Sequence, residues 1–249
     1  MSQFASTNLA IDGIKLKLDN KAILGGVSFK LNINPNMGHS IAIIGKSGAG
    51  KSALLKCIMG ILTPQEGTIK FNGTPLNVRN KNLLFDRLGM VFQGSALFDS
   101  LCVWENIGFK YLYGSKKLSR NKIKRLAEQT LEKVGLNHKC ANQFPVELSG
   151  GMQKRVAIAR AIITEPDILF FDEPTAGLDP VTSRNINALI RDLLSISKAS
   201  ALTITHDMKT VRSFAQDVFL MDDGLFVWSG NKNEMRSSSN AYIKEFLNT

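Results

Sequence analysis

One stretch, residues 41–52, constrains the fold of this chain more than any other. It reads IAIIGKSGAGKS, and its last eight residues match the pattern G-x-x-x-x-G-K-[ST]. The four apolar residues before the match predict a buried strand, and residues 52–59 predict a helix. A chance glycine-rich turn would not need such flanks, whereas a phosphate-binding loop does. The sequence therefore predicts an α/β fold that binds a nucleoside triphosphate at this loop.

The residues of the loop have separate predicted roles. Its glycines allow positive φ, so that successive backbone N–H groups can point at a polyphosphate. Lys51 is expected to reach the β- and γ-phosphates and the Ser52 hydroxyl to hold Mg²⁺, while the following helix directs its positive dipole end at the charge. The predicted nucleotide contacts are Gly45, Lys46, Ser47, Gly48, Ala49, Gly50, Lys51 and Ser52.

The composition indicates a folded chain without a membrane span. Of its 249 residues 44% are hydrophobic and 21% charged, which allows a sizeable core. No apolar run approaches the ~18 residues of a membrane-spanning helix. Residues 1–13 do not resemble a signal peptide, so we expect a cytosolic chain. Cys57, Cys102 and Cys140 show no C-x-x-C spacing and are expected to be buried, reduced thiols.

The net charge of +10 comes mainly from one basic block, residues 110–139. The block contains only two acidic residues, Glu128 and Glu132. Its nine basic residues are Lys110, Lys116, Lys117, Arg120, Lys122, Lys124, Arg125, Lys133 and Lys139. Such a block can be a solvated helix face, a surface near an anionic membrane, or a nucleic-acid binding site. The sequence leaves all three explanations open.

The spacing of apolar residues predicts the order of the elements. Residues 9–33 alternate apolar and polar side chains around a turn at Asp19 and Asn20, which predicts antiparallel strands. Further strands are predicted at residues 68–71, 88–92, 168–171 and 201–205, with a hairpin over 217–230. Residues 94–160 carry aromatic, basic and helix-periodic segments instead, and they predict a helical lobe inserted into the α/β core.

Four further motifs fall where predicted strands end or helices begin. They are Gln93, the run Ser149, Gly150 and Gly151, the pair Asp172 and Glu173, and His206. Ligands of open α/β sheets bind beyond the carboxyl ends of the strands, so these motifs are expected near the phosphate loop. The four apolar residues before Asp172 indicate a central strand, which argues against an exposed acidic turn.

The order and spacing of the motifs resemble the ATPase subunits of ATP-binding cassette (ABC) transporters over essentially the whole chain. The matching segments are GKSGAGKS, Gln93, LSGGM at 148–152, ILFFDEP at 168–174, AGLD at 176–179 and THD at 205–207. The resemblance implies one ATPase domain over residues 1–249, a P-loop NTPase of α/β class. Its RecA-like core and N-terminal antiparallel β lobe would lie in 1–93 and 161–249, and its α-helical lobe in 94–160.

The resemblance also implies the roles of residues in hydrolysis, with ATP and Mg²⁺ as cofactors. Asp172, Ser52 and Gln93 would hold Mg²⁺, and Glu173 would polarise the attacking water. His206 would contact the γ-phosphate, and Lys51 and Gln93 complete the catalytic set.

Ser149, Gly150 and Gly151 resemble the signature of the family, which binds the γ-phosphate held by a second copy of the chain. A helix N-terminus can do so because its N–H groups are free and its dipole end is positive. Two ATP molecules would then lie in a head-to-tail dimer. A monomer is expected to be nearly inactive, because each of its sites lacks half of its donors.

The sequence departs from the family pattern at two places, the end of the signature and the position that contacts the adenine base of ATP. The signature usually ends in glutamine, where this chain has Met152, and we expect a small effect. Family members also stack an aromatic side chain on the adenine, at a position that Leu16 or Leu18 occupies here. We therefore expect weak base selectivity, with similar turnover of ATP and GTP.

Within the family, GSALFDSLCVWENIGF at 94–109 and FDEPTAGLDP at 171–180 most resemble the ATPases of bacterial phospholipid transport systems with mammalian-cell-entry domain partners. The resemblance implies a peripheral ATPase on the cytoplasmic face of the inner membrane that moves phospholipid between envelope membranes. Permease subunits would dock near Gln93 to Trp104. The apolar cluster there either receives a permease helix or packs inside the helical lobe, and it comprises Leu97, Phe98, Leu101, Val103 and Trp104.

Two other functions stay open at this point. An ABC ATPase for another solute, such as an amino acid importer, would carry the same motifs. A soluble ATPase acting on nucleic acid or ribosomes would suit the charge of +10. Relatives of that kind usually have two cassettes or a long coiled-coil insertion, so no nucleic-acid partner is expected for this single cassette. The transported substrate binds the permease and cannot be read from this chain.

Overall fold

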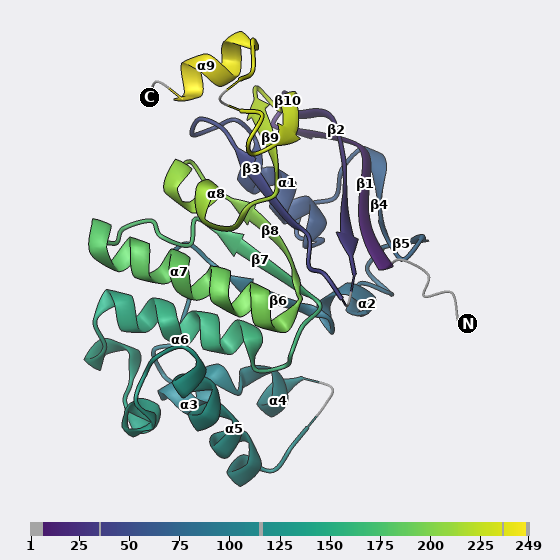
Figure 1. Ribbon diagram of the computed structural model, residues 1–249. Helices are drawn as coiled ribbons and strands as arrows, with labels where there is room; N and C mark the ends of the chain where they lie inside the picture. The colour runs from purple at the N-terminus through teal and green to yellow at the C-terminus, as the bar shows by residue number, and fades with distance from the viewer. Residues whose placement is uncertain (1–6, 35, 115–116, 236, 248–249) are drawn as a thin grey trace.

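The computed structural model describes residues 7–34, 36–114, 117–235 and 237–247. Lys116 of the predicted basic block lies outside the described residues. Two sheets form the framework, with helices around the larger one (Figure 1). The mixed α/β class predicted from the sequence is confirmed.

The N-terminal part is an antiparallel sheet in the order β2-β1-β4-β5. Its strands are β1 (Thr7–Leu18), β2 (Lys21–Ile33), β4 (Glu66–Phe71) and β5 (Thr74–Pro75). β1 and β2 are joined at Asp19 and Asn20, whose φ angles of 48° and 62° are the left-handed values that a tight hairpin turn needs. The predicted hairpin is therefore confirmed.

The larger sheet has the order β10-β9-β3-β8-β7-β6. Its strands are β3 (Ser40–Ile44), β6 (Leu88–Val91), β7 (Ile168–Asp172), β8 (Ser200–Ile204), β9 (Asp217–Asp222) and β10 (Leu225–Asn231). All neighbours pair in parallel except the β9–β10 hairpin. The carboxyl ends of β3, β6, β7 and β8 therefore meet at one edge of the sheet.

Helices cover both faces of this sheet. They include α1 (Lys51–Ile58), α2 (Asn82–Phe85), α7 (Pro180–Ser197), α8 (Met208–Phe214) and α9 (Ala241–Leu247). Side chains of β7 alternate between the faces: Phe170 packs with α1 and the N-terminal sheet, and Phe171 packs with α7. The Asp179 carboxylate caps α7 by accepting from the N–H groups of Val181 and Thr182.

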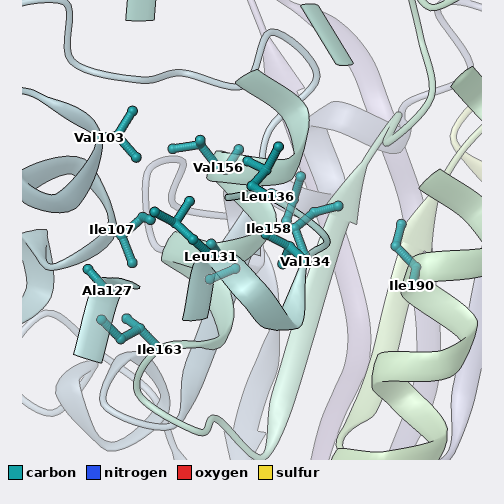
Figure 2. Packing of buried hydrophobic residues seen from close by; sticks show 14 of the residues in the cluster. Val103, Ile107, Ala127, Leu131, Val134, Leu136, Val156, Ile158, Ile163 and Ile190 are labelled. Atoms are coloured by element: carbon teal, nitrogen blue, oxygen red, sulfur yellow. The ribbon is translucent and has the colours of Figure 1, made fainter. Parts of the chain in front are cut away.

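The helices between β6 and β7 gather at one end of the molecule (Figure 1). They are α3 (Val103–Ile107), α4 (Phe109–Tyr113), α5 (Arg120–Lys133) and α6 (Gly150–Ile162). Figure 2 shows Ile107 of α3, Leu131 of α5 and Val156 of α6 directed into one cluster, and each is fully buried. This cluster continues to Phe171, so the lobe and the parallel sheet share a core.

The described helices include none that is long and apolar enough to cross a membrane. Cys57, Cys102 and Cys140 are free and buried, as expected from their spacing. Burial raises the pKa of the Cys57 thiol to about 11, so this thiol stays protonated near neutral pH.

Candidate functional site

A cavity of about 510 Å³ lies at the carboxyl edge of the parallel sheet. Eight of the predicted site residues line it, which are Ser47, Gly48, Gly50, Lys51, Ser52, Gln93, Glu173 and His206. They come from the loop between β3 and α1 and from the residues just after β6, β7 and β8. The fold thus brings four distant segments to one place, as the topology of an open parallel sheet requires.

The phosphate loop needs glycine at its first position for a steric reason. Gly45 has a φ of 153°, and a Cβ there would lie 2.2 Å from the backbone oxygen of Met221. Gly50, at φ 105°, closes the loop as the N-cap of α1. Lys46 projects outward instead, and its Nζ lies 2.5 Å from Glu245 Oε1 of α9.

Lys51 lies almost buried under the loop, with 8% of its surface exposed. Its Nζ donates to the backbone oxygens of Gly45 at 2.6 Å and Lys46 at 2.9 Å. Burial lowers the pKa of Lys51, while the nearby carboxylates of Glu173 and Asp172 act in the opposite direction. The ammonium group therefore lies against the loop that is predicted to bind the phosphates.

Glu173 and His206 form a hydrogen-bonded pair across the cavity. Glu173 Oε1 lies 2.8 Å from His206 Nδ1, and Glu173 Oε2 accepts from the Thr205 hydroxyl at 3.1 Å. Glu173 has a φ of 46°, uncommon for a residue other than glycine, and its N–H donates to Ile204 O. This turn directs the carboxylate toward the space beside the phosphate loop.

Asp172 lies one residue earlier at the end of β7 and is half-buried. Burial and the adjacent Glu173 raise the pKa of the Asp172 carboxyl, and Lys154 and Lys51 oppose that shift. A divalent cation beside two such carboxylates would stabilise their charged forms. Ser52 and Gln93, whose side chains carry the oxygen donors that Mg²⁺ prefers, line the cavity together with Glu173, whereas Asp172 lies next to Glu173 and is not among the lining residues. The residue types fit the predicted ion.

The signature residues lie outside this cavity. Ser149 caps α6, its Oγ accepting from the Met152 N–H at 3.3 Å, and Gly150 follows with an exposed surface. Ser149, Gly150 and Gly151 do not line the cavity of their own chain, so their contact with a γ-phosphate held by another copy stays a prediction.

The prediction that Leu16 contacts the base is wrong for this structure. The Leu16 side chain is 1% exposed, because it points from β1 into the core beneath the N-terminal sheet. Leu18 at the end of β1 is 40% exposed, and its proposed contact stays a prediction. Sequence reasoning missed Ile23 of β2, which lines the cavity, because no motif marks it.

The prediction of a docking cluster is also wrong for two of its residues. Val103 is fully buried and Trp104 is 9% exposed, and both pack in the core of the helical lobe. Neither can therefore receive a permease helix. Phe98 remains 42% exposed and stacks on Phe109, with ring centroids 4.4 Å apart.

A further side chain near the site has no counterpart among the sequence predictions. Lys154 of α6 is only 2% exposed, and its Nζ donates to the backbone oxygens of Phe92 at 3.1 Å and Gln93 at 2.7 Å. Burial lowers the pKa of Lys154 to about 8, against the attraction of Asp172. Lysine is usually a surface residue, so its type alone gave no signal of this position.

A phosphate loop, an acidic strand end and a histidine at one edge of a parallel sheet define a P-loop ATPase. The family model described as ABC transporter matches residues 26–176, more than half of the chain, and the chain belongs to this family. It is the ATP-hydrolysing subunit of a transporter.

Several known proteins resemble the chain over most of its length. The protein TRIGALACTOSYLDIACYLGLYCEROL 3, chloroplastic, of Arabidopsis thaliana is 41% identical, over 91% of this chain and 69% of its own. The intermembrane phospholipid transport system ATP-binding protein MlaF of Haemophilus influenzae is 35% identical, over 87% of this chain and 83% of its own. The methionine import ATP-binding protein MetN of Campylobacter jejuni is also 35% identical, over 96% of this chain and 75% of its own.

A solved structure resembles the fold closely. It is the dimeric, post-hydrolysis state of the ATP-binding cassette MJ0796 bound to ADP and Pi. It superposes with a TM-score of 0.76 at 27% identity, over 90% of this chain and 98% of that one. The P-loop NTPase fold predicted from the sequence is therefore confirmed.

Proposed function

We propose that this ATPase drives the movement of phospholipid between membranes, together with permease subunits and a lipid-binding partner of the mammalian-cell-entry type. The similarity to MlaF carries the proposal, because that relative is named for intermembrane phospholipid transport and this chain covers 83% of it. The Arabidopsis relative, whose name is that of a glycolipid, supports it further. We expect a peripheral position on the cytoplasmic face of a bacterial inner membrane.

The second candidate function is import of an amino acid. MetN, a methionine import protein, has the same identity to this chain as MlaF, and it covers more of the chain. The ATP site is common to both functions, so it does not separate them. The permease and its soluble partner decide which solute moves.

We infer that hydrolysis occurs between two copies of the chain, as the dimeric structure of MJ0796 suggests. The phosphate loop and Lys51 of one copy would bind ATP, and Ser149 with Gly151 of the other would close on its γ-phosphate. Glu173, oriented by Thr205 and His206, would then polarise the attacking water. Asp172, Ser52 and Gln93 would hold Mg²⁺, which would supply charge stabilisation of the phosphates.

Permease subunits would dock on the face around Gln93 and Phe98. The guanidinium of Arg160 lies 6.0 Å from the Phe98 ring, and Tyr113 nearby in the chain is 61% exposed. An exposed aromatic group five residues after Gln93 is the type of surface into which an apolar helix face fits.

The partners and the lipid can be identified in one experiment. The tagged chain is purified from detergent-solubilised membranes of its host, and the co-purified proteins and lipids are determined by mass spectrometry. We expect a permease, a mammalian-cell-entry domain protein and enriched phospholipid. Recovery of a permease with an amino-acid-binding protein, and no mammalian-cell-entry protein, would contradict the proposal of phospholipid transport and support amino acid import.

The nucleotide preference gives a separate prediction. Base stacking on an aromatic side chain contributes ~1–3 kcal/mol per base, and Leu18, the remaining residue expected at the base position, is aliphatic. We expect kcat/KM for ATP and GTP to agree within ~3-fold, measured as phosphate release by the purified protein. A preference for ATP of tenfold or more would show that another group recognises adenine.

A further inference from the structure

The segment that follows β6 is irregular, and two cations of α6 hold it. Lys154 donates to the backbone oxygens of Phe92 and Gln93, as described above. Six residues later on α6, Arg160 donates to Ser95 O at 2.8 Å and Ala96 O at 2.7 Å. Four carbonyl groups of one short segment are therefore bonded to one helix.

The backbone between these contacts is in an unusual conformation. Ser95 and Ala96 have φ angles of 61° and 47°, in the left-handed region that residues with a Cβ rarely occupy. Such a conformation persists only where surrounding contacts determine it. Asn106, which is fully buried, fixes the far end by accepting from the N–H of Phe98 at 2.8 Å and donating to its oxygen at 3.0 Å.

Lys154 is an unexpected choice if packing is its only role. A buried ammonium group is unfavourable unless its charge and its donors are satisfied. In the described part of the chain, the hydrogen bonds of Lys154 go to two neutral carbonyls and to no carboxylate. An apolar residue would fill the same space at lower cost, so the contact with the Gln93 segment is the distinguishing feature of this position.

We propose that Lys154 and Arg160 clamp the Gln93 segment to α6, so that Gln93 moves with the N-terminus of that helix. Lys154 lies five residues after Ser149, about 7.5 Å along the helix axis. When Ser149 contacts ATP that is bound by a second copy, α6 moves, and Lys154 and Arg160 transmit this movement of α6 to Gln93 of the same chain. Lys154 is thus a positioning residue that acts through Gln93, and this inference rests on the proposed dimer.

Lys154→Met tests the clamp, since it removes both hydrogen bonds and keeps an unbranched side chain. We expect kcat for ATP hydrolysis to fall at least ~10-fold, with the affinity of the monomer for a fluorescent ATP analogue changed less than ~2-fold. Lys154→Arg, which retains a charged donor, is expected to recover most of kcat. Equal loss in Lys154→Arg and Lys154→Met, or a kcat within ~2-fold of the parent in Lys154→Met, overturns the proposal.

Lys110→Met is the matched control. The Lys110 Nζ likewise joins the helical lobe to the core, donating to the oxygens of Phe85 at 2.7 Å, Asp86 at 3.2 Å and Leu88 at 3.4 Å, before and at the start of β6 and not after its end. We expect a lower melting temperature and an unchanged kcat. If Lys110→Met lowers kcat as much as Lys154→Met, weaker contact between the helical lobe and the core explains both losses of activity, and the clamp is rejected.

ATP-driven dimerisation separates failure of the clamp from failure of the proposed function. In a Glu173→Gln background, light scattering with ATP should show a dimer, and added Lys154→Met should raise the ATP concentration needed at least ~5-fold. A Glu173→Gln protein that stays monomeric would contradict the proposed dimer itself. A dimer that forms equally well with Lys154→Met would contradict only the clamp. Should Lys154→Met not fold, Lys154→Leu is measured in its place, since it likewise removes both hydrogen bonds, with the same expected changes.

Discussion

Glu173→Gln is expected to lower kcat for ATP hydrolysis at least ~100-fold while leaving ATP binding intact. The amide has nearly the shape of the carboxylate, so the contacts with Thr205 and His206 can persist. It has no negative charge, however, and cannot polarise a water molecule for attack on the γ-phosphate. Because Lys51 and the glycines of the loop are unchanged, the affinity for nucleotide should stay within ~2-fold.

Three measurements on the purified chain check this expectation. Steady-state phosphate release gives kcat, binding of a fluorescent ATP analogue gives affinity, and light scattering with ATP reports a dimer that no longer separates. Glu165→Gln is the control, since it makes the same chemical change at an exposed residue outside the cavity. Turnover retained by Glu173→Gln would remove Glu173 from its catalytic role.

The phosphate loop and the strand ends could be predicted because their signals are local. Residues 41–52 combine an apolar run with fixed glycine positions, and the run 168–171 before Asp172 can be buried only as a central strand. The carboxyl ends of parallel strands meet at one edge whatever the loops between them do. Gln93, Glu173 and His206 could therefore be expected to line one cavity before their distances were known.

The errors concern side chains whose environment depends on tertiary packing. Leu16 and Leu18 lie on the same face of β1 in an alternating pattern, yet only Leu16 is covered by the core. Val103 and Trp104 form part of an apolar cluster that suits a docking site or a helical core equally well in sequence. Lys154 was missed for the opposite reason, because a lysine in a helix is expected in solvent.

Ser149→Asp is expected to abolish hydrolysis through the partner copy without unfolding its own. Aspartate and serine are about equally good N-caps, so α6 should still begin at the same residue. In the proposed dimer the new carboxylate would face the γ-phosphate of the ATP bound by the other copy. Two unit charges ~4 Å apart repel by about 4 kcal/mol at an effective dielectric constant of ~20. Such a term corresponds to a fall in kcat/KM of about 1000-fold.

Ser149→Asn is the matched control, because it caps the helix as well and differs from Ser149→Asp only in charge and one atom type. We expect Ser149→Asn to keep a substantial part of its turnover, and both variants to bind nucleotide as monomers with the parent affinity. Only Ser149→Asp should fail to dimerise with ATP when Glu173→Gln is also present. Since Ser149 lies outside the cavity of its own chain, a loss specific to the charged variant can be explained only by a phosphate from a second copy. Equal activity of the two variants would mean that no phosphate approaches this helix end.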